Sequence, residues 1–469
     1  MEPGERQTET QGETGTPSRR NLLRAGGATV AAGLAGCSLL DGNDDTAELQ
    51  SCPIDVEESP AAYRTHPNDD VRMWRGGLRR LGYYPEETVP ESVSVNWTFP
   101  INYIGHTAAK SSPVPTPDGE QIMFAGDEAR IESYRPSGRN NWTTWTAGTS
   151  LGFHGSAAIV DDVAYIGCYD GDIYALDMDS GNVVWNVSSE DLGDTLAIGS
   201  SPAYYKGILY VVAEYENPSS GALWAIDAET GDIIHVDDRM WGQAHPSPTI
   251  DLEYGRLISG SNDGAVYCWK FPCLEFDWKF QTGPEGGPNG EPKADGEFNL
   301  GAEVKGTAPT FDGRVYVGSW DNHLYCLDVE TGEELWSFEA GNIVMSNPAA
   351  DPNEGVVYVG SSDHYVYALD AETGEELWSR DVGGRVTGSV TVTEQTVLVG
   401  STGSYLYALD KETGEPRWSR SNRGHVTSAA VPLDGRIYFA ERAVFNNYYD
   451  DTKETELVEP GHAYCLVED

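Results

Sequence analysis

Short stretches of hydrophobic residues recur from residue 93 to the C-terminus, and glycine- or aspartate-rich turns separate them. From residue 155 the chain reads GSAAIV, VAYIG, DIYALD and NVVWNV, and from residue 346 it reads SNPAA, VVYVG, HYVYALD and EELWSR. β-Branched and aromatic residues dominate each stretch. Four short strands of this kind, joined by tight turns, are typical of a four-stranded antiparallel meander.

This unit occurs eight times. Its third strand recurs in eight versions, such as DIYALD, HLYCLD and the terminal HAYCLVED. The last unit lacks a fourth strand, but the stretch VSVNWTF at residues 93–99, with Trp97, stands alone at the other end of the repeat region. We therefore predict an all-β, eight-bladed β-propeller, in which the N-terminal strand completes the last blade and closes the ring. In the other units the fourth strand carries Trp142, Trp185, His235, Trp278, Trp336, Trp378 or Trp418.

The sequence DxxTGxxxW, or a close variant of it, links the third strand to the fourth. Its Asp is suited to accept hydrogen bonds from backbone N–H groups of the turn, and its Gly supplies a positive φ. Its Trp is expected to bury its ring against the neighbouring blade. We interpret these residues as blade-building: Asp177, Gly181, Trp185, Asp328, Gly332, Trp336, Asp370, Gly374, Trp378, Asp410, Gly414 and Trp418.

This repeat resembles that of the pyrroloquinoline-quinone (PQQ)-like propellers, over roughly residues 93–469. The resemblance implies one of two classes: quinoprotein dehydrogenases that hold PQQ and calcium, or cofactor-free scaffolding lipoproteins. The dehydrogenases carry two adjacent cysteines, whereas no two of the seven cysteines here are adjacent. We expect a binding or scaffolding module without catalytic residues, metal or cofactor. A PQQ- and calcium-dependent dehydrogenase and a glycan-binding surface protein are the alternatives.

The N-terminus has the features of an export signal. Arg19 and Arg20 precede a short apolar run, AGGATVAAGLAG, which is too short to span a bilayer and is followed by Cys37. The pair resembles a twin-arginine signal, and LAGC resembles a lipobox, which implies a lipid on Cys37 and an anchor on the outer face of the cytoplasmic membrane. We predict a signal peptide at 1–36, an acidic flexible tether at 37–60, a lead-in segment at 61–92 and the propeller at 93–469.

The amino-acid composition indicates the type of host and argues against one class of partner. The chain has 75 acidic and 30 basic residues and a net charge of −45. Carboxylates spread over the whole chain are typical of a salt-adapted protein, because molar salt screens their repulsion. We expect a halophilic, archaeal host. Nucleic acid is not expected as a partner, since phosphates require a basic surface. We expect other envelope proteins or an anionic ligand as partners.

Basic residues are enriched where the first strand of each blade begins. Of the eight equivalent positions, only Gly199 and Met345 are not Lys, Arg or His. We hypothesise a basic channel mouth that attracts an anionic ligand; the alternative is that these cations only relieve the repulsion between carboxylates. The residues are Lys110, His154, His245, Lys305, Arg385 and His425, with Arg423 nearby.

The loops between second and third strands add aromatic residues to the same face, where they suit contacts with proteins or sugars or are ordinary turn residues. Long insertions interrupt the pattern at 281–304 and 441–461. Cys268 and Cys273 flank one turn and could form a disulfide. The aromatic residues are Tyr169, Tyr215, Trp320, Tyr365 and Tyr405, and the acceptors for N-glycosylation are Asn96, Asn141 and Asn186.

Overall fold

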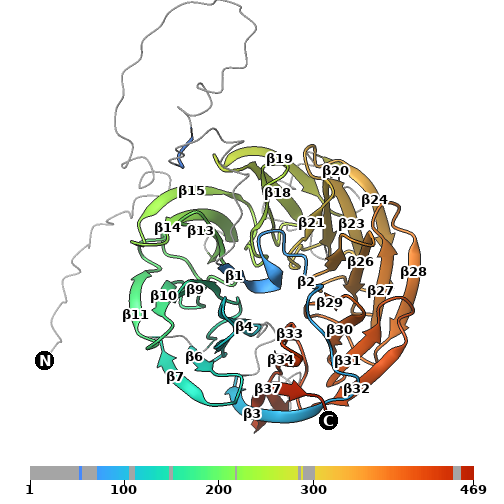
Figure 1. Cartoon of the computed structure of the whole chain (residues 1–469). Helices are drawn as coiled ribbons and strands as arrows, with labels where there is room; N and C mark the ends of the chain where they lie inside the picture. The colour runs from blue at the N-terminus through green and yellow to red at the C-terminus, as the bar shows by residue number, and fades with distance from the viewer. Residues whose placement is uncertain are drawn as a thin grey trace, which may run out of the picture. The chain divides into compact units, whose positions relative to one another are not determined.

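The computed structural model describes residues 52–54, 71–104, 111–146, 151–216, 219–283, 287–288, 302–446 and 456–469. The chain divides into the units Met1–Asp44 and Asp45–Asp469, and the second contains all of these residues. They form eight antiparallel sheets arranged around a central channel, which confirms the eight-bladed propeller (Figure 1). Within these ranges the helical element is the short turn η1 (Trp74–Gly76), and no helix is long and apolar enough to cross a bilayer.

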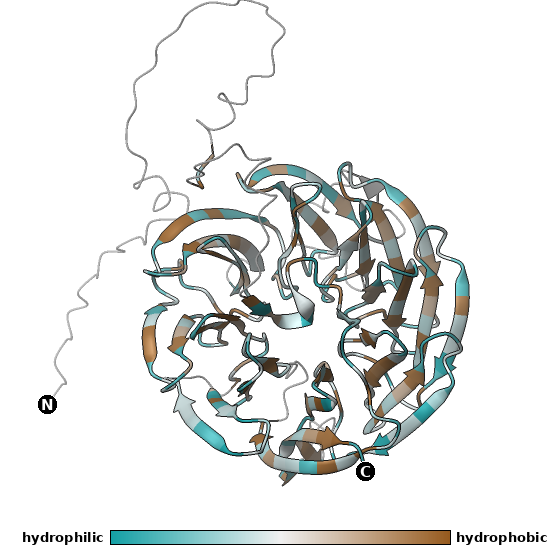
Figure 2. Ribbon diagram, viewed as in Figure 1, coloured by the Kyte–Doolittle hydropathy of each residue, from teal (hydrophilic) through white to brown (hydrophobic). Residues whose placement is uncertain are grey.

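The first strand of each blade faces the channel and the fourth lies at the rim. Hydrophobic residues dominate the inner strands, whereas hydrophobic and polar residues alternate along the rim strands (Figure 2). Blade 1 consists of β4 (Val114–Pro115), β5 (Ile122–Ala125), β6 (Arg130–Tyr134) and β7 (Asn140–Trp145), and blade 2 of β8 (Ala158–Val160), β9 (Val163–Gly167), β10 (Ile173–Asp177) and β11 (Val183–Val187). Blade 3 consists of β12 (Ala203–Tyr205), β13 (Ile208–Glu216), β14 (Ser219–Asp227) and β15 (Ile233–Met240). Blade 4 consists of β16 (Thr249–Asp251), β17 (Arg256–Gly260), β18 (Ala265–Lys270) and β19 (Glu275–Gln281), and β20 (Gly287–Pro288) adds a fifth strand to it. Blade 5 consists of β21 (Thr310–Phe311), β22 (Arg314–Gly318), β23 (His323–Asp328) and β24 (Glu334–Glu339). Blade 6 consists of β25 (Ala349–Asp351), β26 (Val356–Gly360), β27 (Tyr365–Asp370) and β28 (Glu376–Asp381). Blade 7 consists of β29 (Thr391–Thr393), β30 (Thr396–Gly400), β31 (Tyr405–Asp410) and β32 (Pro416–Ser421).

Blade 8 joins the two ends of the propeller. Its strands β33 (Val431–Leu433), β34 (Arg436–Ala440) and β37 (Gly461–Val467) come from the C-terminus, and β3 (Ser94–Asn102) completes it. Trp97 lies opposite Cys465 in the antiparallel pairing of β3 with β37. This confirms the predicted closure. The insertion at 441–461 contributes the hairpin of β35 (Val444–Asn446) and β36 (Glu456–Glu459).

Most of the repeated Trp residues interlock with the turn of the following blade, whereas Trp418 donates to the carbonyl of Pro90. Trp336 Nε1 donates to the carbonyl of Ala371 (3.2 Å), and its ring lies against Gly374, where a Cβ atom would come within 2.6 Å of the ring. Asp370 accepts the N–H groups of two turn residues, and Gly374 has φ +74°. The glycine therefore has a second role beyond its positive φ, because it leaves room for the tryptophan. Equivalent pairs are Trp142/Gly181, Trp278/Gly332 and Trp378/Gly414.

The seam between blades 3 and 4 lacks this interlock. His235 replaces the Trp, and the facing turn contains Phe271 and Leu274 where blades 2, 3, 5, 6 and 7 have the Asp–Gly motif. Ile54 is buried there with both of these residues, and a disulfide links Cys52 to Cys273. The N-terminal segment thus fills the seam that has no tryptophan.

The disulfide differs from the Cys268–Cys273 pair that the sequence had suggested. Cys268 is a buried free thiol that faces the core between blades 4 and 5. Cys273 lies in the turn beyond β18 and contacts the segment from the N-terminus. Residues on the same hairpin therefore point into different cores. Cys326 and Cys465 are likewise buried and free.

The lead-in segment crosses the channel and closes one end of it (Figure 1). Strand β1 (Val71–Met73) pairs with β8 of blade 2, and β2 (Tyr83–Tyr84) pairs in parallel with β29 of blade 7. Between them the carbonyls of Leu78, Arg79 and Leu81 accept N–H groups from the first strands of blades 4, 5 and 6.

Two fully buried arginines hold this segment in place. Arg80 donates to the carbonyls of Pro248 (3.1 Å), Ser201 (3.1 Å) and Pro202 (2.8 Å), and Arg75 donates to that of Val390 (3.0 Å). The first strands have an open edge toward the channel, so their carbonyls need donors. Burial lowers the pKa of Arg75 to about 10 and that of Arg80 to about 9, so both are charged at neutral pH.

Candidate ligand-binding pocket at the channel mouth

The unplugged end of the channel forms a pocket of about 980 Å³. Its walls are residues just before the first strands together with loops between second and third strands, and Trp74 of the lead-in segment is part of its lining. The lead-in segment binds the same first strands further along their course, so the pocket is closed at its base. We call the face onto which it opens the pocket face.

A ring of hydroxyl and amide side chains supports the pocket wall. In six of the eight blades, one residue accepts a backbone N–H from the preceding blade, at 2.7–2.9 Å. These bonds satisfy donors at the open edges of the first strands and hold neighbouring blades in register. Sequence reasoning missed this ring, although a Ser, Thr or Asn stands at the same position in seven repeats and only the last has Ala429. In order the acceptors are Ser112, Ser156, Ser201, Ser247, Thr307 and Asn347, and Asn347 donates on to Ser389.

Most of the predicted basic residues converge on this pocket. Arg423 is not among the lining residues; it is ion-paired with Glu459 at the surface. Lys110 lies outside the described residues. Arg442, which the sequence analysis missed because it belongs to the insertion in blade 8, lines the pocket instead. The predicted residues in the lining are His154, His245, Lys305, Arg385 and His425, with Gly199 and Met345 between them.

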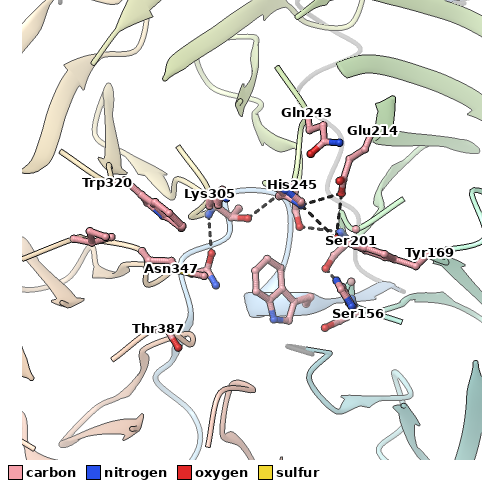
Figure 3. A pocket seen from close by; sticks show the side chains of 18 of the residues that line it. Ser156, Tyr169, Ser201, Glu214, Gln243, His245, Lys305, Trp320, Asn347 and Thr387 are labelled. Atoms are coloured by element: carbon pink, nitrogen blue, oxygen red, sulfur yellow. Dashed lines mark hydrogen bonds and ion pairs between the residues drawn. The ribbon is translucent and has the colours of Figure 1, made fainter. Parts of the chain in front are cut away.

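A buried carboxylate on blade 3 organises one side of the pocket. Glu214 lies 2.9 Å from Nδ1 of His245, and the hydroxyl of Tyr169 is 3.4 Å from that nitrogen (Figure 3). Burial and the charge of Glu214 raise the pKa of Tyr169 well above its usual value, so the phenol stays protonated. The ring of Tyr169 also contacts that of His154, with centroids 3.6 Å apart. Glu214 was not predicted; it lies in the elongated strand β13 of blade 3.

Lys305 lies near the indole of Trp320 on the opposite side (Figure 3). The Nζ atom of Lys305 is 4.1 Å from the ring centroid of Trp320, which is a cation–π contact. Burial lowers the pKa of Lys305. Burial, followed by the charge of Arg442, lowers the pKa of His425.

The five aromatic loop residues do not form one surface. Tyr169 and Trp320 are in the pocket lining, whereas Tyr365 and Tyr405 are exposed on the loops of blades 6 and 7. Tyr215 is buried instead. Its hydroxyl donates to the carbonyl of Leu192 (2.8 Å) and accepts a hydrogen bond from Nε1 of Trp224.

Other predicted sites lie away from the pocket. Asn96 and Asn186 are exposed on the rim strands β3 and β11, and Asn141 is half-buried with its amide donated to Gln121. Arg19, Arg20 and Cys37 lie outside the described residues. Within the described ranges no group of three or more acidic, His or Cys side chains is placed to hold a metal ion.

Comparison with protein families gives one extended match. The family model described as outer membrane protein assembly factor BamB matches residues 92–272, 277–383 and 362–452. BamB of Moranella endobia (strain PCIT) is 24% identical over 200 residues, which cover 41% of this chain and 47% of that protein. BamB of Salmonella typhimurium is 22% identical over 335 residues, which cover 69% of this chain and 72% of that protein. The chain thus spans about half the length of the first relative.

Solved structures of both functional classes share the fold. A quinohemoprotein alcohol dehydrogenase from Comamonas testosteroni aligns with a TM-score of 0.67 at 15% identity, covering 90% of this chain and 84% of that one. BamB from Moraxella catarrhalis aligns with a TM-score of 0.56 at 16% identity, covering 80% of this chain and 99% of that one. At these identities the similarity shows the fold alone.

Proposed function

Because this chain belongs to the family described as outer membrane protein assembly factor BamB, we propose that it is a non-catalytic scaffolding propeller that binds other envelope proteins through its pocket face. The family match, which extends over most of the propeller, is the observation that carries this proposal. The pocket supports it, because it offers a recessed surface whose charge is opposite to that of the rest of the chain.

The proposal includes export by the twin-arginine route and a lipid anchor on Cys37, in a halophilic host. The N-terminal segment reaches the propeller at Cys273, in a turn between third and fourth strands. Those turns lie on the face opposite the pocket, because successive strands run in opposite directions. An anchor ahead of Cys52 would therefore leave the pocket face free for a partner.

The second candidate is a quinoprotein dehydrogenase, favoured by the shared fold and the cationic pocket. PQQ is a tricarboxylate, so the cations would suit it. The donor set does not suit calcium, which takes six to eight oxygen ligands. Glu214 is the one carboxylate in the described lining, and it is already paired with His245. The third candidate, a glycan-binding protein, rests on the exposed Tyr365 and Tyr405.

Site-specific photo-crosslinking in intact cells tests the scaffolding function. A photoreactive residue at Tyr365 or Tyr405 should give one discrete adduct. The same residue at Glu372 or Glu412, exposed turn positions on the opposite face of the same two blades, should give none. Cys37→Ser should release the chain from the membrane fraction and remove the adduct.

An enzyme assay provides the opposing outcome. Reduction of an artificial electron acceptor by the purified chain, dependent on added PQQ and calcium, would establish the dehydrogenase and reject the scaffold. Adducts of equal yield from both faces would reject the pocket face as the binding surface.

A further inference from the structure

Two cations of the pocket form no ion pair within the described part of the chain, although acids outnumber bases in this chain by 75 to 30. Some cations elsewhere are ion-paired, as in Arg256–Asp277 (2.8 Å) and the buried Lys411–Asp351 (2.7 Å), whereas Arg75 and Arg80 donate to backbone carbonyls. Among the described residues, neither Lys305 nor Arg385 has a carboxylate within ion-pair distance. Lys305 instead lies against the ring of Trp320. Lys305 is half-buried and Arg385 is exposed in the pocket, so both are open to an anion that enters it.

The pocket also contains unused hydrogen-bonding groups. The Nε1 donor of Trp320 and the hydroxyl of Thr387 are buried and have no hydrogen-bond partner in the described part of the chain. Both residues line the pocket (Figure 3). Buried polar groups normally find partners, so these groups add neutral polar contacts to the two cations.

The shape and rim of the pocket restrict what can enter. The lead-in segment lies at its base, so a polymer can enter it as a chain end or a tight turn but cannot pass through the channel. Leu196, in the lining, is 42% exposed, and Trp241, next to the lining residues on blade 3, is 58% exposed. These side chains place apolar surface beside a cationic interior.

We propose that the pocket binds the carboxyl-terminal end of a partner polypeptide, with Lys305 and Arg385 neutralising the terminal carboxylate and the apolar rim contacting the residues before it. This rests on the proposed function, because it specifies how the pocket face binds its partner. Capture of a terminal carboxylate is an established mode of peptide recognition, and it requires few contacts beyond the chain end.

Binding of synthetic peptides to the purified full chain tests this proposal. The probe is an array of hexapeptides with apolar residues at the last two positions, each made with a free carboxyl terminus and as the C-terminal amide. Free acids should bind at least tenfold more tightly than their amides. Lys305→Gln and Arg385→Gln should each weaken the binding of free acids about tenfold and leave the weak binding of amides unchanged.

Arg423→Gln is the matched control, because Arg423 is ion-paired with Glu459 outside the pocket, and it should bind like the unmodified chain. Unfolding midpoints of all variants should agree, so that lost binding is not lost folding. Equal binding of acids and amides, or saturable binding of PQQ without binding of any free-acid peptide, would overturn the proposal. Adducts from the pocket face together with equal acid and amide binding would reject the carboxyl-terminal mode alone and leave the scaffolding function standing.

Discussion

At the scale of single residues, the buried carboxyl group of Asp127 links the stability of the fold to pH. Asp127 in the loop after β5 is fully buried and accepts the N–H groups of Tyr103 (2.7 Å) and Ile104 (2.9 Å). Burial outweighs these bonds and raises its pKa to about 7. Between the unfolded value near 4 and pH 7, the folded chain therefore holds a proton that the unfolded chain has lost. This contribution stabilises the fold at low pH and disappears as the pH rises through 7.

Asp127→Asn should remove this pH dependence. The amide cannot ionise, so the stability of the variant relative to the unmodified chain should rise by about 3 kcal/mol between pH 5 and pH 8. Guanidinium unfolding at both pH values measures the change. Asp118→Asn, in an exposed turn of the same blade, is the control, since Asp118 has a lowered pKa and is ionised throughout this range. Parallel pH profiles for Asp127→Asn and the unmodified chain would refute the assignment.

At the scale of elements, most blades are locked to the next by a tryptophan on the rim strand and a glycine in the following turn. Gly374 and Gly355 belong to the same blade and have similar positive φ values, +74° and +67°. They differ in their surroundings: a Cβ at Gly374 meets the ring of Trp336, whereas a Cβ at Gly355 meets nothing within 4 Å. Alanine substitutions at these two glycines therefore distinguish the destabilisation caused by backbone conformation from that caused by packing against the ring.

Gly355→Ala should cost about 1 kcal/mol, the penalty of a left-handed conformation. Gly374→Ala should lower the free energy of unfolding by about 1 to 3 kcal/mol more than Gly355→Ala, because the methyl group must displace the indole of Trp336. Chemical unfolding monitored by tryptophan fluorescence measures both losses. If the two variants lose the same amount, the interlock makes no contribution of its own.

At the scale of the whole molecule, three long-range connections hold the ring closed. Strand β3 completes the last blade, the lead-in segment spans the channel, and the Cys52–Cys273 disulfide joins residues 221 positions apart. The disulfide lies at the seam that lacks a tryptophan. Closing so long a loop restricts the unfolded chain strongly.

Cys273→Ser should therefore lower the stability by about 2 to 5 kcal/mol. Thermal unfolding with and without reductant tests this: reductant should lower the melting temperature of the unmodified chain to that of Cys273→Ser and leave the variant unchanged. A reductant effect of equal size on both proteins would show that another thiol is responsible.

The sequence by itself determined the blades, their number and the closure of the ring, because strand alternation acts over a few residues and repeats eight times, and Asp–Gly turns mark five of the blades. It also located His154, His245, Lys305, Arg385 and His425 at equivalent positions, which the ring symmetry brings together. Their convergence follows from the repeat.

Only the tertiary structure decided the remainder of the site and the N-terminal connections. Glu214 and Arg442 come from departures from the repeat, and Trp74 comes from a segment whose path depends on the carbonyls of distant blades. The disulfide partner of Cys273 likewise depends on where a remote segment packs. These features depend on contacts between residues tens to hundreds of positions apart, for which local pattern carries no signal.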